Sequence, residues 1–170
     1  PDGLELLAKG KSARETVETL TSADGNKQRR QLGIVDTRGN SAAFTGSGCH
    51  QWAGHIEKPN FCAQGNILTG KEVVDAMAAS FEQSQKQAKG GLCNWLIDAL
   101  TAGQDAGGDS RGRQSAALLV VRKKGGYGGG NDRFIDLRVD DHKTPIMELR
   151  RLLQLHKNLF KRAHANPPKG

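Results

Sequence analysis

Polar residues that could bind or transform a substrate follow a glycine-rich stretch in the second half of the sequence. They directly precede an apolar run and are Asp109, Arg111, Arg113, Gln114 and Ser115. Polar side chains just before a buried strand lie at the end of a sheet, where binding and catalytic sites tend to form. We therefore treat this set as a candidate site.

A second polar set surrounds the strand expected over residues 133–142. It contains four carboxylates and one imidazole, namely Asp132, Asp136, Asp140, Asp141 and His142. These groups could line a cleft, where they would orient a nucleophile or bind a cation. The simpler alternative is a polar strand face on which the acids pair with Arg133 and Arg138.

Two further patterns resemble ligand sites. Residues 65–72 match a phosphate-binding loop except at the last position, where Glu72 replaces the Ser or Thr that holds magnesium. A capping box of Thr69 and Glu72 explains this stretch without a nucleotide. Side chains suited to zinc also occur, but their spacing fits no standard zinc site; they are Cys49, His50, His55 and Cys62. We therefore expect no metal and no cofactor.

The composition indicates one globular domain. The chain has 170 residues, 36% of them hydrophobic, and no apolar stretch long enough to cross a membrane. Its three cysteines are an odd number at unrelated spacings, which favours a reducing, cytoplasmic compartment. The formal charge of +7 suggests nucleic acid. However, much of the excess lies in the last segment, where no aromatic residues for base stacking alternate with it, so we do not expect that partner.

The residues around the first polar set predict a β-hairpin. Ser115 to Arg122 contain an apolar run too short for a typical helix, so we expect a strand covered on both faces. Residues 133–142 alternate between apolar and polar, the pattern of a strand with one apolar face. Five glycines within residues 125–130 exclude a regular element and predict the connecting loop.

The remaining patterns predict helices and a second hairpin. Helical patterns include a capping box of Ser12 and Glu15 and a last helix with Thr144 as N-cap. Up to residue 68, the expected elements are helices ending at Ala8 and near Ser22, a hairpin of residues 31–35 and 42–45, an irregular segment over 46–60, and a strand over 61–68. After residue 68, we expect helices from Thr69 and over 92–102, the hairpin above, and the last helix before a tail at 166–170. This order favours an α+β fold with antiparallel sheets.

Several of these stretches resemble a known family. The motifs that carry the resemblance include Gly-Gly-Asp-Ser-Arg-Gly-Arg-Gln-Ser (107–115), Gly-Gly-Tyr-Gly-Gly-Gly-Asn-Asp-Arg (125–133), Asp-Leu-Arg-Val-Asp-Asp-His (136–142) and Gln-Gly-Asn (64–66). On these motifs the chain is identified as a member of the bacterial and archaeal family called domain of unknown function ten-twenty-eight. The resemblance covers nearly the whole chain.

The resemblance implies a fold like that of the N-terminal-nucleophile hydrolases, with two stacked antiparallel sheets between helix layers. In such enzymes the first residue of the mature chain supplies the nucleophile, and its free amine acts as the base. This sequence lacks the opening strand pair, and Pro1 has neither hydroxyl nor thiol, so we expect residues 1–165 to form one domain of this type that is incomplete at its N-terminus. Exposed sheet edges left by missing strands would favour a homo-oligomer.

The leading hypothesis from the sequence is therefore hydrolysis of a small amide or peptide-like bond by the complete protein. Asn66 follows a strand and is expected to contact the oxyanion or substrate, and Ser115 is the second expected catalytic residue. The expected substrate-binding residues are Gln64, Asp109, Arg113, Gln114, Asp132 and His142. The alternative is a non-catalytic binding or scaffold protein that retains the fold.

Overall fold

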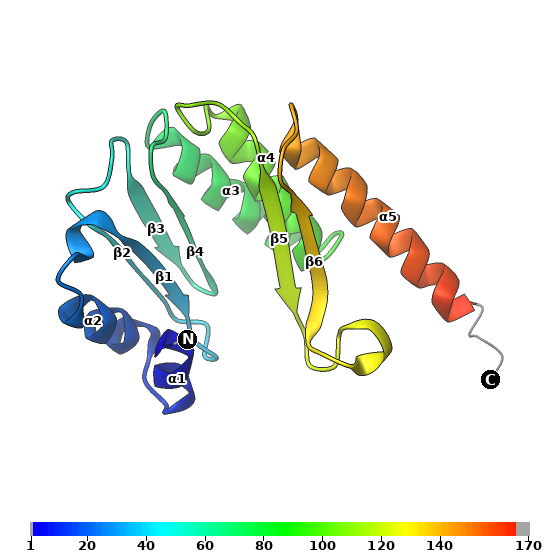
Figure 1. Ribbon diagram of the computed structural model, residues 1–170, viewed down its shortest axis with the longest axis horizontal. Coiled ribbons are helices and arrows are strands. Elements are labelled where there is room, and N and C mark those ends of the chain that lie inside the picture. Colours follow the sequence, from blue (N-terminus) through cyan, green and yellow to red (C-terminus); the bar gives the residue numbers. More distant parts are fainter. Residues whose placement is uncertain (1, 166–170) are drawn as a thin grey trace. The chain divides into compact units, whose positions relative to one another are not determined.

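The computed structural model describes residues 2–165 and shows an α+β protein (Figure 1). Within these residues there are five α-helices and three two-stranded antiparallel sheets. None of the described helices is long and apolar enough to span a bilayer. Pro1 and the expected tail at 166–170 lie outside the described residues.

The chain divides into two compact units. Unit 1 contains residues 1–79 and 102–111, and unit 2 contains residues 80–101 and 112–170. The chain passes between the units within α3 (Glu72–Gln87), within α4 (Leu92–Asp105), and once more after Arg111. The sequence predicted both helices and the glycine break between them. Helix α3 begins at Glu72, however, and not within a capping box of Thr69, whose backbone N–H instead donates to Gly108 O.

Unit 1 begins with two helices that precede its strands. These are α1 (Asp2–Ala8) and α2 (Ala13–Ala23). The expected capping box starts α2, because Ser12 N donates to the Glu15 carboxylate at 2.8 Å and Glu15 N donates to Ser12 Oγ at 3.3 Å. The buried side of α2 places Ala13 and Val17 against the first hairpin.

Two hairpins complete unit 1. The first, β1 (Gln31–Val35) with β2 (Ser41–Thr45), was expected from the sequence. The second pairs β3 (Gly54–Lys58) with β4 (Phe61–Gly65). We expected residues 46–60 to be irregular, but this range contains strand β3. It was missed because Ile56 is its only large aliphatic residue, which is too little to establish a period of two.

Alternate residues of the first hairpin face in opposite directions. Leu32, Ile34 and Phe44 pack on α2. The opposite face contains Gln31, Gly33 and Thr45, and it meets the second hairpin through the hydrogen bonds described below. The turns of the two hairpins also meet, since Asn60 N donates to Gly39 O at 2.7 Å. The hairpins therefore lie together from their open ends to their turns.

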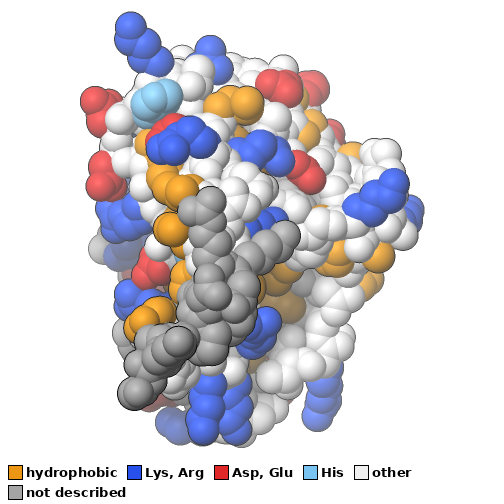
Figure 2. All heavy atoms as spheres, turned by 90° about the vertical axis from the view of Figure 1, so that its right-hand side faces the viewer, with side chains coloured by type: hydrophobic (Ala, Val, Ile, Leu, Met, Phe, Trp, Pro, Cys, Tyr) orange, Lys and Arg blue, Asp and Glu red, His pale blue; other side chains and the backbone are white. Residues whose placement is uncertain are grey.

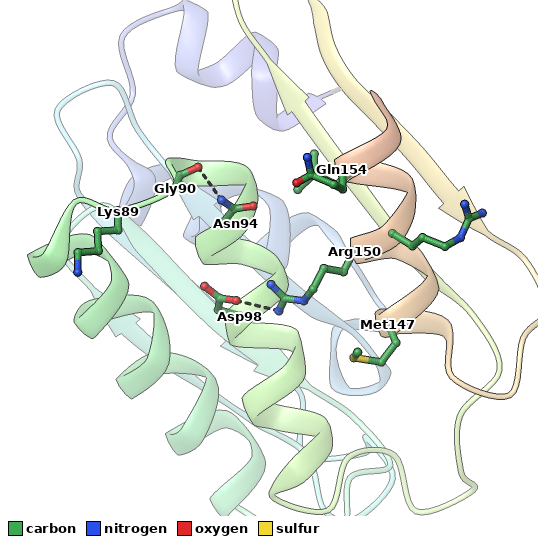
Figure 3. A pocket seen from close by; sticks show the side chains of 9 residues that line it. Lys89, Gly90, Asn94, Asp98, Met147, Arg150 and Gln154 are labelled. Atoms are coloured by element: carbon green, nitrogen blue, oxygen red, sulfur yellow. Dashed lines mark hydrogen bonds and ion pairs between the residues drawn. The ribbon is translucent and has the colours of Figure 1, made fainter. Parts of the chain in front are cut away.

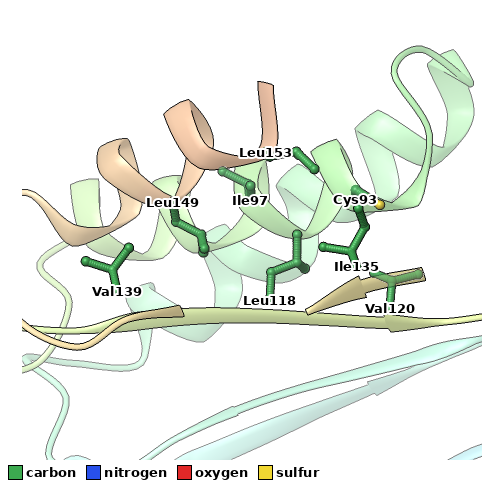
Figure 4. Packing of buried hydrophobic residues seen from close by; sticks show 8 residues of the cluster. All are labelled: Cys93, Ile97, Leu118, Val120, Ile135, Val139, Leu149 and Leu153. Atoms are coloured by element: carbon green, nitrogen blue, oxygen red, sulfur yellow. The ribbon is translucent and has the colours of Figure 1, made fainter. Parts of the chain in front are cut away.

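Unit 2 is built on the predicted hairpin of β5 (Ala116–Val121) and β6 (Arg133–Val139). One face of this hairpin packs on α4 and α5 (Pro145–Ala165) (Figure 4). The buried cluster is Cys93, Ile97, Leu118, Val120, Ile135, Val139, Leu149 and Leu153. Helix α5 starts as predicted, because Thr144 O accepts the N–H of Glu148 at 3.0 Å and Pro145 is the first helical residue.

The second face of β5 differs from the expectation. Leu119 and Val121 are 59% and 65% exposed, whereas the sequence predicted a strand covered on both faces. Cross-strand partners on this face include Asp136 and Arg138. An apolar run shows that a strand can be buried on both sides, but the run does not determine whether a second layer is present.

Candidate functional site

The two hairpins of unit 1 meet along a layer of polar side chains that we call the seam. Cross-strand pairs place His55 beside Gln64 and Glu57 beside Cys62 on one face of the second hairpin. These four residues, together with Gln31, Gly33 and Thr45 of the first hairpin, define the seam. Layers between stacked sheets are normally filled by apolar side chains, so this composition is unusual.

Gln31 ties the open ends of the two hairpins together. Its Nε2 donates to Thr45 Oγ1 at 3.0 Å, to Gly54 O at 3.2 Å and to Gly65 O at 2.8 Å. Thr45 Oγ1 in turn lies 2.8 Å from His55 Nδ1. Hydrogen bonds from one hairpin to the other therefore hold this end of the seam in register.

Gln64 and Asn66 bring two buried oxygens to the same end. Gln64 Oε1 and Asn66 Oδ1 are buried and have no hydrogen-bond partner among the described residues. Gln64 lies over Gly33, where an added Cβ would come within 2.5 Å of Oε1. Because a buried acceptor without a donor costs about 1–3 kcal/mol, such groups call for an explanation.

Backbone hydrogen bonds fix the segment that carries Asn66. Leu68 N donates to Trp52 O at 2.9 Å, and Ser110 N donates to Ile67 O at 2.8 Å. An isolated antiparallel bridge pairs Leu68 with Asp109. The residue that follows β4 is thus held from both sides, as expected for a positioned functional group.

Glu57 and Cys62 of the seam keep their ordinary charge states. Burial would raise the pKa of Glu57, but hydrogen bonds from Ala43 N and Arg14, together with the positive charge of Arg14, lower it overall. Burial raises the pKa of the Cys62 thiol, and the Glu57 carboxylate raises it further. Cys62 is therefore a neutral thiol at pH 7 and a poor nucleophile.

Asp109 belongs to unit 1 but forms a pair of its own. Arg111 donates to both carboxylate oxygens, at 2.9 Å from Nε and 2.6 Å from Nη2. This hydrogen bonding lowers the pKa of Asp109, which is therefore a carboxylate and not a general acid at neutral pH. Asp109 pairs through its bridge with Leu68, which lies two residues after Asn66 in the chain.

Four candidate residues of unit 2 lie at one end of the β5–β6 hairpin. Gln114 and Ser115 precede β5 and are exposed, and Gln114 O accepts the N–H of His142 at 2.9 Å. His142 Nδ1 accepts the N–H of Thr144 at 3.0 Å, so this imidazole supports the start of α5. Arg113 is exposed in the same segment.

Asp132 lies at the other end of the same hairpin. Its carboxylate accepts Lys124 N at 2.8 Å, and its carbonyl accepts Arg122 N at 2.8 Å, so it closes the loop. Six residues of strand separate this end from Ser115, roughly 20 Å at about 3.3 Å per residue. The structure does not bring Asp132 to Ser115.

Other members of the acidic set follow the simpler alternative. Arg133 pairs with Asp136 at 2.8 Å, and Arg138 pairs with Asp140 at 2.8 Å, all on exposed side chains. Among residues 2–165, no three His, Cys, Asp or Glu side chains are grouped so as to hold a metal ion.

The sequence also matches a family model over residues 1–149, described as a family of unknown function, DUF1028. The chain belongs to the DUF1028 family. This assignment confirms the resemblance drawn from the motifs. No curated protein matches the sequence.

A crystal structure of a DUF1028 protein from Silicibacter pomeroyi is similar to this chain. The two are 32% identical in sequence, with a TM-score of 0.77. The alignment covers 90% of this chain but 64% of the other. This chain therefore spans less than two thirds of the length of that DUF1028 relative.

Most seam residues were not predicted as site residues. Gln31, Thr45 and Glu57 carried no recognisable motif, and His55 and Cys62 were considered only as zinc ligands. Prediction of β3 would have supplied the missing signal, because His55 and Glu57 alternate with Ile56 on that strand. Of the seam, only Gln64 was expected from the sequence as a site residue, together with Asn66 just beyond its end.

Proposed function

We propose that the complete protein hydrolyses a small amide or peptide-like bond, with a fold like that of the N-terminal-nucleophile hydrolases. In this proposal, residues 1–165 form one such domain, and the nucleophile lies outside the described residues. The observation that carries the proposal is the pair of buried, unpaired oxygens on Gln64 and Asn66 at the end of the seam. A buried acceptor is stabilised when a donor approaches it, and an amine is such a donor.

The two carboxamides suit complementary tasks in such a reaction. The oxygen of Gln64 can accept a hydrogen bond from the α-amine of an N-terminal nucleophile. That amine takes the hydroxyl or thiol proton as the nucleophile attacks the carbonyl carbon. Asn66 Nδ2 can then donate to the resulting oxyanion. The proton passes to the departing amine, and water releases the acyl group from the nucleophile.

Intact mass and N-terminal sequencing of the protein expressed from its complete gene test the proposal first. A mature chain that begins with Thr, Ser or Cys would supply the required nucleophile. A natural product that begins at or near Pro1 would exclude this chemistry. The non-catalytic binding or scaffold function would then be the better explanation.

Substitution of Asn66 tests its role once an amide substrate is found. We expect Asn66→Ala to lower kcat about 100-fold or more, because it removes an oxyanion donor. Asn158→Ala is a matched control, since Asn158 lies on α5 and bonds only to Gln154 within the described part of the chain. Unchanged turnover in Asn66→Ala would reject the assigned role.

The second candidate function is non-catalytic binding by the same seam. The raised pKa of Cys62 favours it, because this half-buried thiol is not activated for attack. A ligand would then donate to Gln64 and Asn66 without being cleaved. A primary amide that protects the seam from hydrogen exchange and stays intact by mass spectrometry would support this function.

The proposal includes a homo-oligomer in a reducing, cytoplasmic compartment. All three cysteines are free, which fits such a compartment. Leu119 and Val121 leave an apolar strand surface exposed, and surfaces of this kind favour association. Light scattering coupled to size-exclusion chromatography of the full-length protein tests the oligomer; a monomeric mass would contradict it.

A further inference from the structure

Unit 2 contains an open groove between α4 and α5 that the proposed hydrolase function does not use. Its volume is about 670 Å³, which is within the range of small-molecule sites. Figure 3 shows Asp98 and Arg150 pointing toward one another from the two helices. The lining residues are Lys89, Gly90, Asn94, Asp98, Met147, Arg150, Arg151, Leu153 and Gln154.

Hydrogen bonds fix the rim of this groove near Gly90. Asn94 Nδ2 donates to Gly90 O at 2.8 Å, and Trp95 Nε1 donates to Lys89 O at 2.6 Å. From α5, Lys157 Nζ reaches Asn94 Oδ1 at 2.9 Å. The connection between α3 and α4 is therefore anchored to α4, and α4 is anchored to α5.

Positive charge predominates in the lining. Lys89, Arg150 and Arg151 are cationic and Asp98 is acidic, which gives a formal sum of +3 − 1 = +2. Arg151 pairs with Glu148, which lies outside the lining, so part of this charge is neutralised. The groove still offers an electrostatic preference for anions over cations.

Arg150 retains donors after its own contacts are made. It donates to Asp98 at 2.8 Å and to Thr101 Oγ1 at 3.1 Å, both through Nη2. Within the described residues Nη1 and Nε have no partner, so they can donate to a ligand. The contact with Asp98 holds the Arg150 guanidinium across the groove, and the positive charge of Arg150 neutralises the Asp98 carboxylate. Guanidinium groups fixed in this way suit carboxylate and phosphate oxygens.

Apolar surface accompanies these donors. Met147 is 58% exposed and lies one helical turn before Arg150, and the buried Leu153 also contributes to the lining. We propose that the groove binds a small organic anion, with its carboxylate or phosphate on Arg150, Lys89 as a second positive charge, and its apolar part on Met147. This site lies within unit 2 and does not depend on the chemistry assigned to the seam.

Calorimetric titration of the full-length protein with hexanoate, hexyl phosphate and inorganic phosphate tests this site. We expect a hexyl compound to bind more tightly than inorganic phosphate, since only the former covers Met147. Comparison of hexanoate with hexyl phosphate identifies the preferred anionic group. If neither hexyl compound binds, or if inorganic phosphate binds as tightly as both, the proposal is wrong.

Substitutions separate the groove from the general positive charge of the protein. Lys89→Ala should weaken binding of the preferred hexyl compound about tenfold, because it removes a charged donor. Met147→Ala should weaken the hexyl compounds and leave inorganic phosphate unchanged. The double variant Arg150→Gln/Asp98→Asn should abolish binding without leaving an unpaired charge in the groove.

Lys9→Ala is the matched control, since it removes one charge after α1 in unit 1. An equal loss of affinity in Lys9→Ala and Lys89→Ala would show that only net charge matters and would overturn the proposal. Binding that survives both Lys89→Ala and the double variant would overturn it as well. Circular dichroism of each variant establishes that its fold is retained.

Discussion

The inner hairpin faces of the two units have opposite chemistry. In unit 2 the β5–β6 hairpin presents Leu118, Val120 and Ile135 to two helices, and all three are buried. In unit 1 the β1–β2 and β3–β4 hairpins present Gln31, His55 and Gln64 to each other. The first arrangement contributes stability through the burial of apolar surface. The second brings polar groups together, and the buried oxygen of Gln64 remains unpaired among the described residues.

This contrast indicates that different requirements determine the inner residues of the two units. An apolar seam of the same size would stabilise unit 1 more than the polar one does, since unpaired buried acceptors are costly. Proteins retain such groups mainly at functional sites. The seam is therefore the part of the molecule in which function, not stability, best explains the residues.

The largest expected effect comes from the apolar core of unit 2. Ile97→Ala should lower the free energy of unfolding by about 2–5 kcal/mol, because Ile97 is fully buried and leaves a cavity. Leu155→Ala on α5 is the control, and it should change little because Leu155 is 46% exposed. Denaturant unfolding measures both, with Trp95 fluorescence reporting on unit 2. A small effect of Ile97→Ala would contradict the assignment of this core.

A backbone contact in unit 1 has the next largest expected effect. A Cβ on Gly46 would lie 2.3 Å from Gln28 O and 2.4 Å from Lys27 O, and these are backbone atoms that cannot move away freely. Gly46→Ala should therefore destabilise unit 1 by about 1–3 kcal/mol. Gly25→Ala is the matched control, because nothing lies within 4 Å of its added Cβ. Equal stability of the two variants, with Trp52 as reporter, would refute the contact.

Local patterns predicted much of the fold, as particular elements show. The capping box of Ser12 and Glu15 predicted α2, and Thr144 with Pro145 predicted α5, because helix ends have local chemical requirements. Strand β3 was missed, since five residues with one large aliphatic side chain give no clear period. Helix signals are local, whereas this strand depends on its partners.

The seam could not be predicted because it depends on long-range pairing. Gln31 and Gly65 are far apart in the sequence, yet a hydrogen bond of 2.8 Å joins them. Alternation shows that Gln31 and Leu32 face opposite sides of β1, but it does not identify what covers each side. Asn66 was predicted from a motif, and its buried, unpaired oxygen became visible only in the fold.

A smaller effect, of opposite sign, is expected at the seam. Gln64→Leu should raise the free energy of unfolding by about 1 kcal/mol, because it replaces an unpaired buried polar group by an apolar one of similar size. It should also abolish the proposed function. The control Gln85→Leu changes an exposed residue of α3 and should alter stability by less than about 0.5 kcal/mol. Destabilisation by Gln64→Leu would show that the side chain has a structural role.

The smallest expected effect is a difference between the two units in how their stability falls at acid pH. His156 stacks on Phe160 at 4.2 Å in unit 2, and burial lowers its pKa below the ordinary 6.5. The unfolded chain therefore binds its proton more readily, so the stability from neutral His156 is present above pH 6.5 and is lost as pH falls through the folded pKa.

In unit 1, Glu57 has a pKa below the ordinary 4.5, and its contribution is lost only as pH falls below that value. Acidification should thus weaken unit 2 before unit 1, by an amount that His156→Leu removes. Hydrogen exchange measured between pH 7 and pH 4, with correction for the intrinsic rate, follows each unit separately. If unit 1 loses protection first, or if His156→Leu leaves the order unchanged, then His156 does not set the difference. The contrast between the polar seam and the apolar core would in that case have no counterpart in acid stability.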